Sequence, residues 1–211
     1  MAICYLVGAG AFTMRGLYPA KEDCVIAADG GYSSLQSAGI VPDLLVGDFD
    51  SLQWIPRDIP QKMFPPEKDE TDMELALAEG IARGYQTFYF YGANGGRADH
   101  TLANLQLLGS TSRQSFTCRM VCPKYDVYAI TDETLRLAPI TGGSIVSVFC
   151  HGDRAEGVTL EGLKYPLRQA VLTCDHPLGV SNETTGEEIS ITVGSGTLLV
   201  YVMRQEAMPV Q

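Results

Sequence analysis

Apolar runs alternate with polar segments along the first half of the chain, and the runs have the length of strands. The runs that we expect to form strands are Ile3–Val7, Cys24–Ala28, Leu44–Val46, Thr87–Tyr91 and Cys118–Cys122. Between them, apolar residues recur at helical spacing from Met73 to Ile81 and from Leu102 to Leu108. Strands that alternate with helices favour parallel βα units. The pattern predicts an α/β N-terminal domain over residues 1–123, with a mostly parallel, doubly wound sheet.

The pattern changes after Pro123, where short apolar runs follow one another with turns between them. The expected strands are Val127–Ile130, Ile145–Cys150, Val158–Leu163, Ala170–Thr173, Ile189–Val193 and Leu198–Met203. Glycine pairs such as Gly142-Gly143 are typical of hairpin turns. A small antiparallel sandwich or barrel fits this spacing. We predict an all-β C-terminal sandwich over residues 124–211.

The excess of acidic residues limits the kinds of molecule that the protein is expected to bind. The 211 residues include 15 Lys and Arg against 25 Asp and Glu, which gives a formal net charge of -10. Such a surface argues against nucleic acid or an anionic membrane as a partner, and favours a cationic, metal-bridged or neutral one. No run approaches the ~20 apolar residues of a membrane span. We therefore expect a soluble, cytoplasmic protein.

The six cysteines form no CxxC pair and have no histidine at zinc spacing. Most of them lie inside apolar runs. We expect buried free thiols, which are compatible with a reducing compartment.

Two carboxylates follow one of the expected strands. Asp48 and Asp50 come directly after Leu44–Val46. Because side chains alternate along a strand, both carboxylates would point to one side, roughly 6 to 7 Å apart. Such a pair could hold a hard cation. The alternative is an Asx turn made by Asp48, with Ser51 as the cap of a following helix.

Further acids stand where expected strands end and helices begin. Asp29 closes the strand that starts at Cys24, and Asp69 and Asp72 lie at the helix entrance marked by a Thr71 to Glu74 capping box. Asp99 follows a glycine-rich turn and precedes the second helix. In a parallel sheet these positions and the pair Asp48 and Asp50 converge on one edge.

Carboxylates, glycine turns and one arginine at a sheet edge suit phosphate chemistry with a divalent metal. Glycine turns and helix starts offer N–H groups, Arg97 adds a planar fork, and carboxylates hold Mg²⁺. The familiar nucleotide motifs are missing, because the chain has no GxxxxGK[ST] and Gly8–Thr13 lacks the third glycine of GxGxxG.

A family resemblance rests on six short motifs in one order. They are Asp29-Gly30-Gly31, Gly47-Asp48-Phe49-Asp50-Ser51, Lys68-Asp69-Glu70-Thr71-Asp72, Gly95-Gly96-Arg97-Ala98-Asp99-His100, Gly162-Leu163-Lys164-Tyr165-Pro166-Leu167 and Gly179-Val180-Ser181-Asn182-Glu183. In these motifs the chain resembles the bacterial thiamine pyrophosphokinases. The resemblance implies a homodimer whose subunits carry an ATP- and Mg²⁺-binding α/β domain and a β-sandwich for thiamine binding and dimerisation. It also implies transfer of a pyrophosphoryl group from MgATP to the hydroxyl of thiamine, which leaves AMP.

The same resemblance implies a role for each matched residue. The catalytic set is Asp48, Asp50, Asp72, Asp99 and Arg97, and its four aspartates are the Mg²⁺ ligands. The implied ATP-binding residues are Asp29, Gly30, Lys68, Asp69, Gly95, Gly96 and Arg97. The implied thiamine-binding residues are Thr71, Asp72, Ser181 and Asn182.

Simpler interpretations stay open at several positions. Arg97 would alone be a solvated turn residue, Ser181-Asn182 a simple turn, Asp72 a favourable charge at a helix start, and Lys68 a solvated cation. For His100 we favour a capping role over that of a general base. Residues 54–64 match nothing in the family pattern.

Two other functions are compatible with parts of the sequence. A haloacid-dehalogenase-like phosphatase would use Asp48 as nucleophile and Asp50 as acid, but its pattern has Thr or Val where Leu52 stands. A nucleotide- or thiamine-sensing module without turnover is the other, and it leaves the density of carboxylates unexplained.

Overall fold

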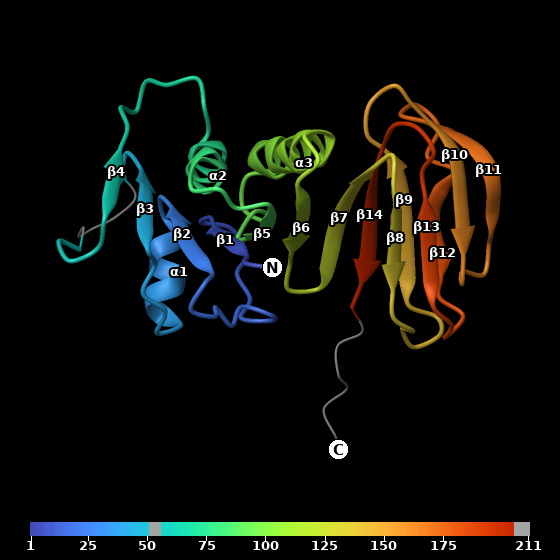
Figure 1. The fold of residues 1–211 in the computed structure, drawn as a ribbon, viewed down its shortest axis with the longest axis horizontal. Coiled ribbons are helices and arrows are strands. Elements are labelled where there is room, and N and C mark those ends of the chain that lie inside the picture. Colours follow the sequence, from blue (N-terminus) through green and yellow to red (C-terminus); the bar gives the residue numbers. More distant parts are fainter. Residues whose placement is uncertain (51–55, 205–211) are drawn as a thin grey trace, which may run out of the picture. The chain divides into compact units, whose positions relative to one another are not determined.

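The computed structural model describes residues 1–50 and 56–204 (Figure 1). The chain forms two compact units. The first contains Met1–Leu107 and Phe116–Pro123, and the second contains Leu108–Ser115 and the residues from Lys124 onward.

The first unit is built on parallel strands. They are β1 (Cys4–Val7), β2 (Cys24–Ala28), β3 (Leu44–Gly47), β4 (Gln61–Met63), β5 (Thr87–Tyr91) and β6 (Thr117–Val121). Within the unit they lie in the order β4-β3-β2-β1-β5-β6, and every pair is parallel (Figure 1). All residues of β1, β2 and β3 are buried, as in a sheet covered on both faces. The prediction of parallel strands is confirmed.

Three helices accompany these strands. They are α1 (Gly31–Ser37), α2 (Asp72–Ala82) and α3 (Ala98–Arg113). Helix α2 packs on the sheet through Met73, Ala76 and Leu77, all buried as the helical spacing predicts. In α3 the expected apolar face is wrong at Leu102, which is 58% exposed. The buried position in that turn belongs to Asn104, because its amide donates to the carbonyl of Ala93 at 2.8 Å.

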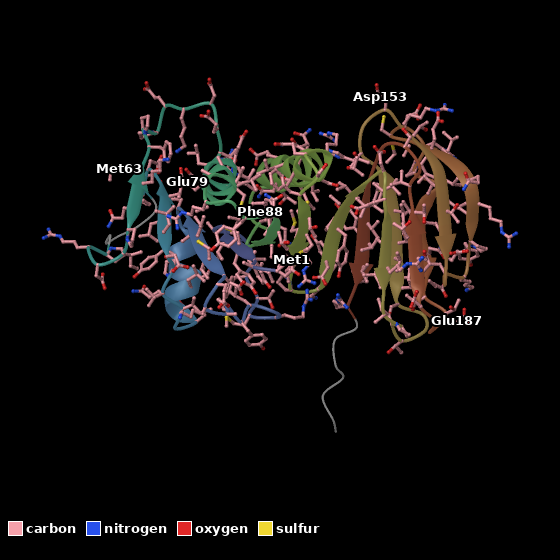
Figure 2. The ribbon with its side chains drawn as sticks, in the orientation of Figure 1. Met1, Met63, Glu79, Phe88, Asp153 and Glu187 are labelled. Carbon is pink, nitrogen blue, oxygen red and sulfur yellow. The ribbon has the colours of Figure 1, made fainter. Side chains whose placement is uncertain are left out.

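The second unit consists of antiparallel strands. They are β7 (Tyr125–Thr131), β8 (Thr134–Leu137), β9 (Ile145–Cys150), β10 (Arg154–Glu161), β11 (Leu167–Thr173), β12 (Gly179–Glu183), β13 (Ile189–Thr192) and β14 (Thr197–Met203). They form two sets within the unit, β12-β9-β14-β7 and β11-β10-β13-β8. Val148 and Val200 of the first set share one buried core with Leu160 and Ile191 of the second. Side chains fill the space around the strands of each unit (Figure 2).

Four of the six cysteines are buried free thiols, as expected, whereas Cys150 is half-buried and Cys174 is exposed. Among the helices of the described part of the chain, none has the length and apolar character needed to cross a membrane.

Candidate active site

The order of the parallel strands marks where a ligand would bind. From β1 the chain proceeds to β2 on one side, and β5 lies on the other side. The direction of strand order therefore reverses between β1 and β5. Ligands of open α/β sheets bind beyond the carboxyl ends of the strands at such a switch point.

Two glycine-containing loops leave these strand ends together. The N–H of Gly8 donates to the carbonyl of Tyr91, and the N–H of Gly10 donates to that of Gly92, both at 2.8 Å. Gly92 has φ +56, and a Cβ there would lie 2.1 Å from the carbonyl oxygen of Gly8. Only glycine permits this approach. The hydrogen bonding between β1 and β5 thus continues into the two loops that follow these strands.

A cavity of about 520 Å³ lies between these loops and two helix starts. Its lining residues are Gly8–Ala11, Ala28, Asp29, Thr71–Met73, Gly92, Ala93, Gly95–Arg97, His100 and Asn104. Glycine turns, an arginine and helix starts therefore meet at the switch point, which suits a phosphate-bearing ligand.

Three carboxylates gather beside this cavity. One oxygen from each of Asp29, Asp48 and Asp50 lies within 4.8 Å of the other two. Asp29 lies close to the end of β3 because residue 47 is a glycine. A Cβ at Gly47 would lie 3.1 Å from the Cβ of Asp29. The N–H of Asp29 donates to the carbonyl of Val46 at 2.8 Å. The ends of β2 and β3 hold the cluster.

The local geometry at Asp48 and Asp50 differs from the strand that we predicted. β3 ends at Gly47, and the N–H of Asp50 donates to Oδ1 of Asp48 at 3.2 Å. This is the Asx turn of the alternative interpretation; the expected cap Ser51 lies outside the described residues. Phe49 has φ +61 and is buried in the core of the first unit. A non-glycine residue in this conformation is held by its surroundings, so the packing of Phe49 fixes the turn.

The cluster carries repulsion that a cation would relieve. The nearby Asp48 charge, followed by burial and the charge of Asp29, raises the pKa of Asp50. Mg²⁺ takes carboxylate oxygens at ~2.1 Å, which puts opposite ligands ~4.2 Å apart. Adjacent ligands lie ~3.0 Å apart, so three oxygens within 4.8 Å of one another must move closer together to share one ion. The donor set fits a hard divalent cation.

Asp72 stands at the start of α2, beside the half-buried Lys68. The hydroxyl of Thr71 caps the helix by accepting from the N–H of Glu74 at 3.2 Å, which confirms the predicted cap. Nζ of Lys68 lies 2.8 Å from Oδ1 of Asp72. Burial opposes the charge of Lys68, but the hydrogen bond to Asp72 and the charges of Asp72 and Asp48 outweigh it and raise the lysine pKa. Lys68 is thus held among the acids and is not the solvated cation of the simpler interpretation.

Arg97 and Asp99 pair with each other at the mouth of the cavity. Nη2 of Arg97 lies 2.5 Å from Oδ2 of Asp99, and its Nε donates to Oδ1 at 3.2 Å. These hydrogen bonds lower the pKa of Asp99 to about 2. Both side chains are exposed, so the pair can open at small cost. In this geometry Asp99 is bound to Arg97 and lies outside the cluster of Asp29, Asp48 and Asp50.

The remaining expected ATP-binding residues are turn residues. Gly30 precedes α1, and a Cβ on the neighbouring Gly31 would lie 1.8 Å from the carbonyl oxygen of Val7. Gly95 and Gly96 have φ +87 and +68 and are exposed at the cavity wall. Asp69 is exposed in the loop before α2.

In the second unit, the two expected thiamine residues differ from each other. Ser181 is exposed on β12 with φ +59, and its N–H donates to the hydroxyl of Ser147. Asn182 is 4% exposed, and its amide clamps the backbone of Tyr165 by accepting from the N–H at 2.9 Å and donating to the carbonyl at 2.7 Å. Its Oδ1 also accepts from the N–H of Glu183. The amide of Asn182 is therefore engaged within the protein.

Sequence reasoning missed two parts of the cavity. The Gly8–Ala11 loop lacks the third glycine of GxGxxG, yet its position after a central strand places it at the switch point. Asn104 also escaped notice, because it falls inside a helix between leucines. The available signal was a polar residue at a position where helical spacing predicts burial.

Comparison with known proteins gives a consistent family. The model of the thiamin pyrophosphokinase catalytic domain matches residues 17–120, and that of the thiamin pyrophosphokinase vitamin B1 binding domain matches residues 132–198. A thiamine pyrophosphokinase of Bacillus subtilis is 29% identical over 189 residues, which cover 87% of this chain and 88% of the relative.

Solved structures are similar over nearly the whole chain. The thiamin pyrophosphokinase of Geobacillus thermodenitrificans is 26% identical with a TM-score of 0.83, over 98% of this chain and 99% of that one. The Bacillus subtilis thiamine pyrophosphokinase structure has a TM-score of 0.87 at 24% identity, over 98% and 100% of the two chains. The yeast enzyme, at 14% identity, has a TM-score of 0.71 over 96% and 86% of the chains.

Proposed function

The chain belongs to the thiamin pyrophosphokinase family, and from that premise we propose how its residues make thiamine diphosphate and AMP from thiamine and MgATP. The observation that carries the proposal is the cluster of Asp29, Asp48 and Asp50 beside the cavity at the switch point. A cluster of acids alone would repel ATP. With a divalent cation among them, the same acids become an anchor for polyphosphate.

We assign Asp29, Asp48 and Asp50 to hold Mg²⁺, with Asp72 and Asp99 completing the acidic edge. When bound, the ion neutralises charge on the phosphate oxygens. Gly95 and Gly96 border the path of the phosphates, and Arg97 leaves Asp99 to bind phosphate oxygens with its planar fork. Lys68 adds a second cation, held in place by Asp72.

The reaction is an in-line displacement at the β-phosphorus of ATP. The hydroxyl oxygen of thiamine forms the new bond, the bond from the β-phosphorus to the oxygen of the α-phosphate breaks, and AMP leaves. The hydroxyl proton passes to a carboxylate of the acidic edge. Because little covalent chemistry falls to the protein, positioning and electrostatics supply most of the catalysis. The acidic surroundings also suit the positive thiazolium ring of thiamine.

Analysis of products tests this function. Purified protein with MgATP and thiamine should give AMP and thiamine diphosphate in equal amounts. ADP with thiamine monophosphate would refute pyrophosphoryl transfer. Inorganic phosphate released without thiamine would support the phosphatase alternative, and ligand binding without turnover would support a sensing module. Neither alternative is favoured by the family matches.

We further propose a division of labour between the two parts of the chain. Residues 1–123 bind MgATP, and residues 124–211 bind thiamine and form a homodimer, which works in the cytoplasm. Right-handed crossovers would put α1 on one face of the first sheet and α2 with α3 on the other, which supports a doubly wound sheet. The common core of the two antiparallel sets supports a β-sandwich in the second unit.

A shared thiamine pocket would require both subunits of the dimer. We test it by mixing two inactive variants, Asp72→Asn and Ser181→Tyr. Ser181 is exposed, so a larger side chain there blocks a pocket without disturbing a core. Random exchange would place both lesions in one pocket and leave the other intact. Partial recovery of activity supports the shared site, and no recovery, with exchange confirmed by mass, means that each pocket is built from one chain.

A further inference from the structure

Two cysteines face each other on neighbouring strands at the edge of the sheet away from the candidate site. Cys4 begins β1, Cys24 begins β2, and the two residues are Cα partners in the parallel pairing. Neighbouring strands lie ~4.8 Å apart. This falls within the ~4.4–6.8 Å between the Cα atoms of a disulfide. Both cysteines are buried free thiols.

Other groups around the pair distinguish the two sulfurs. Nη1 of Arg83, the residue that ends α2, lies 3.6 Å from Sγ of Cys24. Cys4 lies deeper, under α2, where a Cβ on Gly80 would be 2.8 Å from its Sγ. Cys24 is 4% exposed, and Arg83, which contacts its sulfur, is an exposed residue.

These neighbours favour charge on one sulfur. The hydrogen bond from Cys4 and the nearby Arg83 lower the pKa of Cys24, although burial and Asp43 oppose them. The hydrogen bond with Cys24 and burial raise the pKa of Cys4. A low-pKa thiol beside a second thiol is the arrangement of an attacking and a resolving cysteine.

Cys118 and Cys150 are placed differently. On the side of β1 away from β2, Cys4 pairs with Phe88 of β5, which is labelled in Figure 2. Phe88 in turn pairs with Cys118 of β6. Cys118 is thus two strands, or ~9.6 Å, from Cys4, which is too far for a disulfide. The half-buried Cys150 has its pKa raised by burial and by Cys174.

We propose that Cys4 and Cys24 form a reactive thiol pair that hydrogen peroxide converts reversibly to an intramolecular disulfide. The thiolate of Cys24 attacks one peroxide oxygen, the O–O bond breaks, and the hydroxide that leaves takes up a proton to become water. The sulfenic acid on Cys24 is then attacked by the sulfur of Cys4. The S–O bond breaks, and its oxygen leaves as a second water with the proton of Cys4. A dithiol reductant restores both thiols. This oxidation of the two cysteines does not depend on the proposed transferase function.

The test uses the full chain with Cys174→Ser, which removes the exposed thiol. After one equivalent of peroxide and alkylation, the intact mass should show the loss of two hydrogens with two fewer alkylated cysteines. Trypsin cuts after Arg15 and Lys21, so Cys4 and Cys24 fall in different peptides. These peptides should appear joined, and should separate on reduction. If Cys4 and Cys24 stay in separate peptides that are alkylated as fully as Cys118, the proposal is overturned.

Three variants sharpen the result. Cys4→Ala should let a 1,3-dione trap a sulfenic acid on Cys24, whereas Cys118→Ala, the matched buried cysteine, should leave the disulfide unchanged. Arg83→Gln should slow the reaction of Cys24 with peroxide, because the sulfur loses the guanidinium that favours its thiolate. Each variant is used only if its thermal unfolding midpoint matches the parent. An unchanged rate in Arg83→Gln, or a Cys24 that reacts no faster than Cys118, would contradict the assigned roles.

Discussion

The acidic turn of the first unit and the Ser181-Asn182 segment of the second use their polar atoms in opposite ways. Asp48 and Asp50 lie against each other and near Asp29, which raises the pKa of Asp50. Asn182, by contrast, makes its hydrogen bonds to Tyr165 and Glu183 inside its own unit. In the first region the carboxylates repel one another, and a bound cation would relieve that repulsion. In the second region the hydrogen bonds of Asn182 are already formed and hold the backbone in place. Substitutions should therefore separate chemistry in one region from stability in the other.

The largest effect is expected at the acidic turn. Asp50→Asn removes a proposed metal ligand and should lower kcat/KM by ~10³-fold, a size typical of lost electrostatic stabilisation. The same change should stabilise the metal-free protein. The folded-state pKa of Asp50 is raised, so its contribution to stability is favourable at low pH and is lost as pH rises through that pKa. At neutral pH the repulsion is present, and the amide removes it.

Thermal unfolding with a chelator at pH 7 and at pH 4 measures this stability effect. The variant should unfold at a higher temperature than the parent at pH 7, and the difference should shrink at pH 4. A variant that loses activity and is less stable at both pH values would contradict the repulsion.

The next effect is expected at the start of α2. Asp72→Asn should lower kcat by about a hundredfold, because it removes a carboxylate of the acidic edge and frees Lys68. Folding should be nearly intact, since asparagine keeps the volume of aspartate. Glu70→Gln, an exposed acid in the same loop, is the matched control. A fully active Asp72→Asn enzyme would reduce Asp72 to a favourable charge at a helix start.

A smaller effect is expected at the cavity mouth. Arg97→Lys should raise KM for ATP about tenfold, because a point charge cannot reproduce a two-pronged contact with phosphate oxygens. Stability should barely change, since the Arg97 and Asp99 side chains are exposed. Arg57→Lys, another exposed arginine of the first unit, is the control. Unchanged kinetics would mean that Arg97 is a solvated turn residue and does not bind ATP.

The smallest effect on catalysis is expected at Asn182 of the second unit. Asn182→Ala should destabilise the fold by about 2 kcal/mol, because the backbone groups of Tyr165 lose their partner in a buried place. Asn182→Asp keeps the acceptor and loses the donor, so its loss should be intermediate. Urea unfolding measures both. A stable Asn182→Ala protein with a raised KM for thiamine would show that the amide serves the substrate instead.

Much of the fold was predictable from local patterns, because buried strands read as apolar runs and α2 carries its own cap at Thr71. The three missed strands are β4, β8 and β12. β4 is exposed along its whole length, and β12 is rich in polar residues, so neither shows the expected alternation. These strands form because a neighbouring strand offers backbone partners, and that information is tertiary.

The candidate site was predictable in its residues and not in its geometry. The acidic motifs point to Asp48 and Asp50 as metal ligands, but they assign Asp29 to ATP and add Asp72 and Asp99 to the metal set, whereas the cluster contains Asp29. The arrangement of the cluster depends on the positive φ of Phe49, which is set by burial of its ring in the core. The pairing of Arg97 with Asp99 could be anticipated from their closeness in sequence, whereas the crossing of the Gly8 and Gly92 loops depends on which strands are neighbours.

The most direct test of this account is metal binding by the protein alone. Mn²⁺, which shares the oxygen preference of Mg²⁺ and has an electron paramagnetic resonance signal, is titrated into the parent, Asp50→Asn and Glu70→Gln proteins without nucleotide. We predict that the parent and Glu70→Gln bind the ion equally, and that Asp50→Asn binds it at least tenfold more weakly, by ~1.4 kcal/mol or more. Equal binding by all three proteins would contradict the assignment of Asp29, Asp48 and Asp50 as the metal site.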